Sequence, residues 1–133
     1  MKKGIILLFS ILSFSVFSQE NAWVNVVELD GVTIEESVIK CGNNELLTFR
    51  ISNANPYSIT ISWFEEVWIN DICKQNGNIE EFKKSVSLQS NEKVIGDCSF
   101  KESFYIGYKV KRGDNEMKLT FYDLKNISVI IEK

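Results

Sequence analysis

The sequence predicts an all-β domain, an antiparallel β-sandwich of seven or eight short strands. Three observations carry this prediction. Beyond residue 20, apolar and polar residues alternate with a period of two over most of the chain. Clusters of Asn, Gly, Ser and Pro separate these stretches at short intervals. Only the segment Ile79 to Ser85 has a pattern that suits a helical turn.

The first 18 residues have the three parts of a cleaved secretory signal peptide. Lys2 and Lys3 form a basic start, Ile5 to Phe17 is apolar, and Ser18 is a small residue at the expected cut. The apolar stretch has 13 residues, fewer than the roughly 20 that span a bilayer. The first cysteine is Cys41, too far from the cut for a lipid anchor. We therefore expect an exported protein, secreted or periplasmic, that is neither lipid-anchored nor inserted in a membrane after cleavage.

Cleavage after residue 18 leaves residues 19–133 as a single β-sandwich domain of 115 residues, an ordinary domain size. Removing Lys2 and Lys3 from the 15 basic residues leaves 13 against 18 acidic ones, a net charge of −5. No basic run exceeds two residues, which argues against nucleic acid and anionic membranes as partners. The chain has no histidine. This excludes Ser-His and Cys-His catalysis and imidazole metal sites.

The first clear strand pair lies between residues 46 and 63. From Leu47 to Ser52 the odd positions are apolar and the even ones polar, and the alternation returns with Tyr57, Ile59, Ile61 and Trp63. The connecting sequence Asn-Ala-Asn-Pro contains turn formers that would interrupt either strand. We therefore expect two strands joined by a short connection, with Trp63 in the core.

After Trp63 the alternation is interrupted once, and the strands that follow are shorter. The alternation is lost at Phe64-Glu65-Glu66 and resumes at Val67, which suggests a bulge or bend in a long strand. A polar segment from Lys111 to Glu116 has the pattern of a hairpin connection. An early strand is expected from Val32-Thr33-Ile34 together with Val38-Ile39, and further strands at residues 85–89, 94–95, 104–108, 119–122 and 127–131.

Three cysteines in an exported chain allow one disulfide and one free thiol, in three possible pairings. Cys73 and Cys98 each follow a predicted strand, so a bridge between them could join two loops at one end of the sandwich. We favour the pair Cys73–Cys98. Cys41, beside the turn Gly42-Asn43-Asn44, is then the free thiol, or a partner of one of the others.

Two tryptophans are the candidate binding residues. Trp68 follows the expected bend and Trp23 lies near the mature terminus, so both could stay exposed and stack against a sugar ring or a protein partner. No catalytic residue, metal site or cofactor is predicted. The acidic pairs do not form catalytic couples, because adjacent residues on a strand point to opposite faces; they are Glu35-Glu36, Glu65-Glu66 and Glu80-Glu81.

Several segments resemble small secreted proteins of Bacteroidota such as flavobacteria. They are a signal ending in Phe-Ser-Gln, the strands Leu47–Ile51 and Ile59–Trp63 joined by Asn-Ala-Asn-Pro-Tyr, the stretch from Trp68 to Cys73, the segment from Ser85 to Cys98, and the final Leu-Lys-Asn-Ile-Ser-Val. The resemblance implies an immunoglobulin-like sandwich and no activity.

The sequence therefore predicts a non-enzymatic binding or interaction module with an unknown protein or glycan partner. It would act through loops or by lending an edge strand. A structural accessory subunit of a cell-envelope assembly is the alternative. A carboxylate-dependent hydrolase is the remote alternative.

Overall fold

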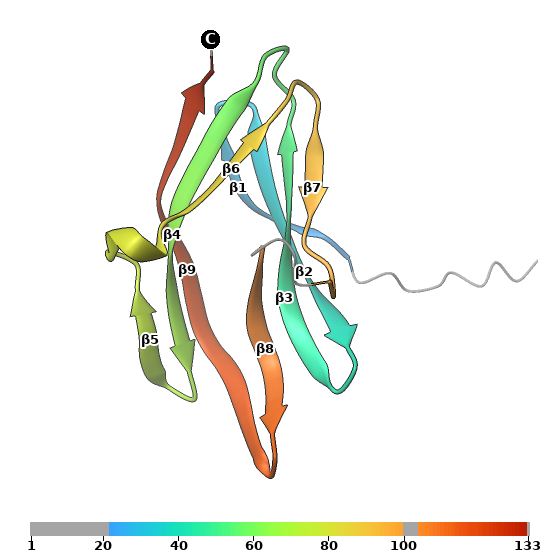
Figure 1. Ribbon diagram of the computed structural model, residues 1–133, viewed down its shortest axis with the longest axis vertical. Coiled ribbons are helices and arrows are strands. Elements are labelled where there is room, and N and C mark those ends of the chain that lie inside the picture. Colours follow the sequence, from blue (N-terminus) through green and yellow to red (C-terminus); the bar gives the residue numbers. More distant parts are fainter. Residues whose placement is uncertain (1–21, 100–103, 133) are drawn as a thin grey trace, which may run out of the picture.

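The computed structural model describes residues 22–99 and 104–132. Nine strands in these ranges form one antiparallel sheet that curls into a half-barrel (Figure 1). The all-β antiparallel class is confirmed, with nine strands in place of the predicted seven or eight. The predicted signal peptide, residues 1–18, and its cut site lie outside the described residues.

The strands have from 3 to 17 residues, and one turn of 3-10 helix stands where a helical turn was expected. They are β1 (Val24–Leu29), β2 (Val32–Cys41), β3 (Asn44–Asn53), β4 (Ile59–Ile69), β5 (Ile72–Asn76), η1 (Glu80–Phe82), β6 (Lys84–Leu88), β7 (Lys93–Ile95), β8 (Tyr105–Arg112) and β9 (Asn115–Ile131).

The sheet has the strand order β1-β2-β3-β8-β9-β4-β5, with β6 also paired to β4 and β7 to β3. The 17-residue strand β9 joins the two halves. Residues 115–118 pair with β8 to form the predicted hairpin, and residues 119–131 pair with β4. One half is thus built on β3 and the other on β4, and β9 belongs to both.

The core lies between these two halves. Ring contacts cross it, from Phe49 on β3 to Tyr122 on β9 and from Trp63 on β4 to Phe104. Trp63 is 1% exposed, which confirms that it is a core residue. The fully buried apolar side chains come from alternate positions of β2, β3, β4 and β6, as the period-two pattern predicts; they are Val32, Ile34, Phe49, Ile51, Ile59, Ile61, Trp63 and Leu88.

Strand β4 runs without a break through the segment where a bend was expected. The alternation seemed lost because a charged residue occupies an inward position: Glu65 is only 4% exposed. Its Oε1 atom lies 2.9 Å from Lys84 Nζ on β6 and accepts a hydrogen bond from Trp63 Nε1 at 3.3 Å. The irregularities of register between β4 and β9 place the extra residues on β9. The buried carboxylate of Glu65, paired with Lys84, therefore gave the sequence pattern of a bulge in β4.

The predicted disulfide Cys73–Cys98 is wrong: Cys41 pairs with Cys98, with 5.5 Å between the Cα atoms. Cys41 ends β2, which pairs with β3, and Cys98 follows β7, which also pairs with β3. Cys73 lies on β5, at the other end of the strand order. It is exposed and free, so the single free thiol among the described cysteines is Cys73 and not Cys41.

Candidate functional site

The two tryptophans predicted to bind lie on different parts of the sheet. Trp68 is on β4, between β5 and β9. Trp23 precedes β1 and contacts Arg50 of β3. Both are half-buried. The structure therefore offers two separate tryptophan surfaces, and their surroundings decide which one is free to bind.

Trp68 occupies the middle of a three-strand row. Its register partners are Cys73 on β5 and Phe121 on β9. Directly opposed residues point to the same face of a sheet, with Cβ atoms about 5 Å apart. Phe121 is 52% exposed and Cys73 is exposed. A thiol, an indole and a phenyl ring therefore line up on one outer face, hereafter the Trp68 platform (Cys73, Trp68 and Phe121).

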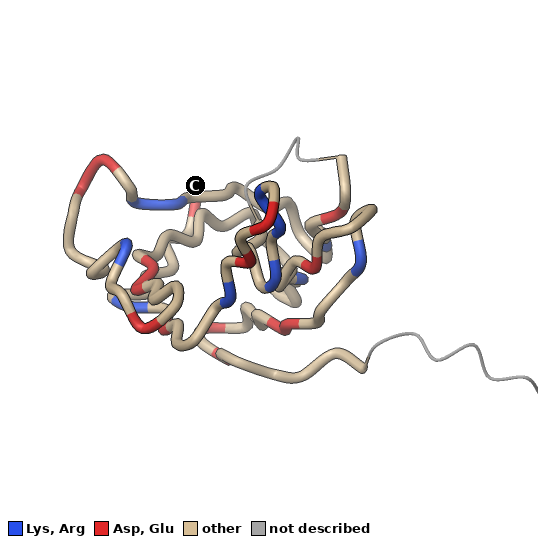
Figure 2. The backbone as a smooth tube through the Cα atoms, turned by 90° about the horizontal axis from the view of Figure 1, so that it is seen from below, with Lys and Arg blue, Asp and Glu red and all other residues tan. Residues whose placement is uncertain are grey.

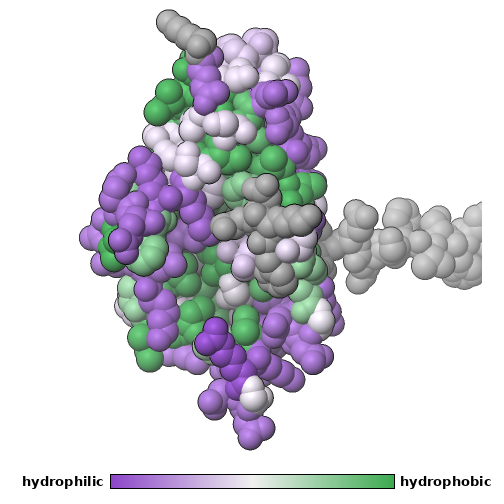
Figure 3. Space-filling view, viewed as in Figure 1, coloured by the Kyte–Doolittle hydropathy of each residue, from purple (hydrophilic) through white to green (hydrophobic). Residues whose placement is uncertain are grey.

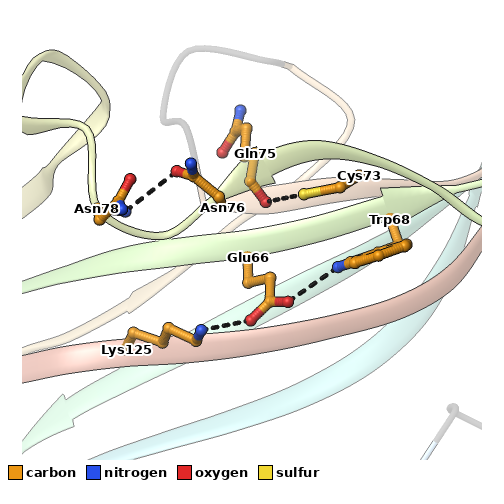
Figure 4. Close-up of polar contacts among 7 residues, drawn as sticks. All are labelled: Glu66, Trp68, Cys73, Gln75, Asn76, Asn78 and Lys125. Atoms are coloured by element: carbon orange, nitrogen blue, oxygen red, sulfur yellow. Dashed lines mark hydrogen bonds and ion pairs between the residues drawn. The ribbon is translucent and has the colours of Figure 1, made fainter.

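A fixed ion pair borders the platform (Figure 4). Trp68 Nε1 donates a hydrogen bond of 2.9 Å to Glu66 Oε1, and Glu66 Oε2 lies 2.5 Å from Lys125 Nζ. The hydrogen bond from Lys125, with a smaller effect of the one from Trp68, lowers the pKa of Glu66. The carboxylate in turn raises the pKa of Lys125. Glu66 thus stays ionised and holds the indole by its edge.

Glycine is required where the Lys125 side chain crosses the end of β5. Gly77 has φ +80°, a conformation that side chains disfavour. A Cβ atom there would lie 2.9 Å from Lys125 Cδ. The missing side chain therefore leaves room for the lysine stem, which carries its ammonium group to Glu66. A larger residue at position 77 would have to displace this stem.

Amide groups form a polar margin beside the platform. Cys73 Sγ donates to the Gln75 carbonyl at 3.3 Å, and the Asn78 amide donates to Asn76 Oδ1 at 3.4 Å (Figure 4). Asn76 is the register partner of Glu66 on β5. An exposed ring row edged by amides and an ion pair can stack against a flat apolar surface and hydrogen-bond the polar groups around it.

Trp23 is engaged differently, because a cation covers its ring. The guanidinium carbon of Arg50 lies 4.5 Å from the ring centroid. Arg50 Nε lies 2.5 Å from Glu35 Oε2, and this hydrogen bond lowers the pKa of Glu35. The guanidinium is thereby held in place, and one face of Trp23 is already occupied.

Phe121 is the platform residue that sequence patterning missed. It stands beside Tyr122 in Leu119-Thr120-Phe121-Tyr122, where Leu119 and Tyr122 pack against the core and Phe121 does not. The register irregularity between β4 and β9 at Trp68 and Ile69 sets which of the two rings faces outward. The signal that could have found it is the break in alternation itself, since two adjacent aromatics on a strand point to opposite faces.

Comparisons with known proteins do not place the chain in a family. No protein-family model, no curated protein and no solved structure matches the chain. Within residues 22–99 and 104–132, no cluster of three His, Cys, Asp or Glu side chains could hold a metal ion. No helix in the same ranges is long and apolar enough to cross a membrane. The geometry of the side chains is therefore the basis for a functional proposal.

Proposed function

We propose that the protein is a non-enzymatic binding module that contacts its partner through the Trp68 platform. The observation that carries the proposal is the row formed by Trp68 and exposed Phe121. The indole N–H of Trp68 already donates a hydrogen bond to Glu66. Aromatic residues on an exposed face supply a large apolar contact area with few rotatable bonds. The partner is a protein or a glycan.

The surroundings of Trp68 favour binding over a purely structural role. Among the described residues, no ring and no cation lies over the faces of its indole. The contact with Glu66 occupies only the N–H group. Ordering the platform on binding therefore costs little, because the ion pair with Lys125 already fixes the neighbouring side chains.

We propose further that the chain is exported to the periplasm or the cell exterior after removal of residues 1–18. The disulfide Cys41–Cys98 supports this destination, because such bonds persist in oxidising compartments. The immunoglobulin-like arrangement of the sandwich stays a prediction. A structural subunit of an envelope assembly stays the alternative function, and a carboxylate-dependent hydrolase the remote one.

The test compares two exposed apolar residues on different parts of the sheet. Phe121→Ser removes a platform ring, whereas Ile95→Ser changes a side chain of similar exposure, 48%, on β7. The probes are a panel of immobilised neutral oligosaccharides and a photo-crosslinking amino acid in place of Cys73, the exposed thiol of the platform, used in the cell envelope of the native host. We expect retention or a discrete crosslink, weakened at least ten-fold by Phe121→Ser and less than two-fold by Ile95→Ser.

Three results would speak against the proposal. Equal effects of the two substitutions would remove the platform as the contact surface. Stoichiometric co-purification with one envelope protein, unchanged by Phe121→Ser, would favour the structural subunit. Cleavage of a retained oligosaccharide would favour the hydrolase.

A further inference from the structure

The C-terminal part of β9 is paired on one side only. Residues 119–131 pair with β4, whereas β8 pairs only with residues 115–118. Within the part of the chain that the structure describes, no strand pairs with the far edge of residues 119–131. Strand β9 is thus internal to the sheet near the hairpin, and it is an edge strand near its C-terminal end.

The ladder with β4 determines which backbone groups lie on this free edge. The Glu132 amide donates a hydrogen bond of 3.0 Å to the Ser58 carbonyl. In an antiparallel ladder, every second residue directs both its N–H and its C=O group to the same neighbour. Ile130 therefore bonds to β4, and the N–H and C=O groups of Val129 and Ile131 face the free edge. An added strand could pair with these groups.

The side chains of the same two residues lie on the core-facing side of the sheet. Val129 and Ile131 are the register partners of Ile61 and Ile59, which are both 0% exposed. Directly opposed residues share a face, yet Ile131 is 51% exposed. Strand β4 has neighbours on both sides, whereas β9 has only β4 here. The core is therefore left uncovered along the free edge, and Figure 3 shows hydrophobic surface beside the upper end of β9.

A hollow of about 330 Å³ opens beside this edge. Val129 and Ile131 line it, together with Asn55 and Tyr57 from the β3–β4 connection and Asp30 from the β1–β2 turn. These five residues are hereafter the β9 hollow. In Figure 2, β1 runs along the lower margin of the molecule, apart from the C-terminus. The hollow is thus flanked by two strands that do not pair with each other.

The free edge of β9 lacks the features that protect the other edges of the sheet. Strand β1 has a register shift and carries Glu28, and β5 has 5 residues and carries Lys74. Short length, bulges and charges discourage pairing with another chain. Residues 128–131 read Ser-Val-Ile-Ile, without charge, proline or register shift. Such a segment is a favourable template for an added strand.

The charge of the β9 hollow favours one kind of segment. Among the described residues, Asp30 is the only charged one in the lining, and it has no ion pair. A segment with alternating apolar residues and one Lys or Arg complements an apolar floor with a single acidic residue. The same strand of a second copy does not, because residues 128–132 contain no cation and end in Glu132.

We propose that a partner protein docks an extended segment on the free edge of β9, antiparallel to it, and fills the β9 hollow. The backbone groups of Val129 and Ile131 bond to this segment. Its alternate apolar side chains cover the open core, and its Lys or Arg reaches Asp30. The β9 hollow shares no residue with the Trp68 platform, so either proposal can fail without the other.

NMR titration of the isotope-labelled chain of residues 19–133 with the capped peptide Lys-Thr-Val-Thr-Val-Thr tests the site. The lysine and both valines share one face of this peptide when it is extended. We expect saturable binding, with the largest shifts at the amides of Asp30, Val129 and Ile131. The peptide Glu-Thr-Val-Thr-Val-Thr should bind at least three-fold more weakly. Absence of saturable binding, or shifts confined to Trp68 and its neighbours, would overturn the proposal.

Methylation of peptide nitrogens tests the strand pairing without altering the protein. Peptide residues opposite Val129 and Ile131 exchange backbone hydrogen bonds with them. N-methylation of both valines should therefore abolish binding. N-methylation of the first two threonines, whose N–H groups face solvent, should weaken binding less than three-fold. Equal losses from the two methylated peptides would show that the peptide does not add a strand.

Two neighbouring isoleucines supply matched protein variants. Ile131→Ser removes a side chain from the β9 hollow, whereas Ile130→Ser changes one of similar exposure, 60%, on the opposite face. We expect at least a five-fold loss of affinity for Ile131→Ser and less than two-fold for Ile130→Ser. Equal affinities of Ile131→Ser and the parent chain would overturn the site.

Two further measurements test the nature of the occupant. Asp30→Asn preserves a residue type that tolerates the positive φ at this turn. It should weaken binding of the lysine peptide about three-fold, as expected for an exposed ion pair. Unchanged affinity would overturn the requirement for a basic residue. Sedimentation of the chain without peptide should give a monomer, and a dimer that Ile131→Ser dissociates would assign the edge to a second copy instead of a partner protein.

Discussion

Trp23 and Trp68 invite comparison because both are half-buried tryptophans beside an acid–base pair. At Trp23 the base lies over the ring: Arg50 contacts the indole face and is held there by Glu35. At Trp68 the acid holds the ring edge, and Lys125 is on the far side of the carboxylate. The same three kinds of side chain thus leave one ring covered and the other uncovered. The part of the ring that is engaged, and not the degree of burial, separates the two surfaces.

The two regions are also held together by different means. Near Trp23, the disulfide Cys41–Cys98 joins segments that flank β3. Near Trp68, no covalent link is present among the described residues, and an ion pair joins buried Glu65 of β4 to half-buried Lys84 of β6. Removing either restraint should therefore affect one region before the other.

The largest effect is expected from the disulfide. Cys98→Ser opens a link that spans 57 residues of sequence and should lower the free energy of unfolding by about 4 kcal/mol in the chain-entropy picture. Urea denaturation measures the loss. Cys73→Ser is the matched control and should change stability by less than about 0.5 kcal/mol.

Thiol titration checks the same assignment independently. The native parent chain should react with one equivalent of thiol reagent and the Cys73→Ser variant with none. One remaining equivalent in Cys73→Ser would contradict the pairing of Cys41 with Cys98.

A smaller effect is expected from the buried ion pair. Lys84→Met leaves the Glu65 carboxylate without its cation and should destabilise the fold by about 3 kcal/mol. Lys83→Met, at an exposed neighbouring position that pairs only loosely with Glu80 at 3.8 Å, should cost less than about 1 kcal/mol. Thermal unfolding followed by tryptophan fluorescence measures both. Equal losses would show that Glu65 does not depend on Lys84.

The smallest effects concern pH and have opposite signs at two glutamates. Lys125 lowers the pKa of Glu66, so its contribution is present above the unfolded pKa and is lost as the pH falls through the folded one. Burial raises the pKa of Glu36, whose Oε2 atom has no hydrogen-bond partner. Ionising Glu36 therefore lowers stability as the pH rises above its unfolded value.

Glu66→Gln should thus lower, and Glu36→Gln raise, the melting temperature at neutral pH. Both differences should vanish at a pH well below 4.5, the ordinary value for glutamate, where both parent carboxyls are protonated. Melting curves from neutral to acidic pH check this. Shifts of the same sign would refute the assignment of Glu36 to a site that penalises charge.

Local patterning accounts for much of this structure. The alternation from Leu47 to Ser52 is β3, that from Ile59 to Trp63 begins β4, and the polar segment after Lys111 is a hairpin. Each of these features depends on neighbours in the sequence. Trp63 likewise follows its inward neighbours into the core.

The features that escaped prediction all depend on strand order or register. The partner of Cys98 follows from which strands flank β3. The outward position of Phe121, beside Trp68, follows from a register irregularity between β4 and β9. Glu65 looked like a bend because its partner Lys84 is on another strand. A period of two shows which residues share a face of one strand, but it cannot show what lies opposite them.

The position of β9 has a consequence for the order of folding. It is the last described strand in the sequence, yet it lies inside the sheet, between β8 and β4. Neither half can be joined to the other until this strand is available, so the decisive contacts connect distant parts of the chain and are expected to form slowly. A chain whose last strand is still being synthesised would have two unjoined halves with exposed apolar faces. Until the final strand is in place, these exposed apolar faces are prone to aggregation.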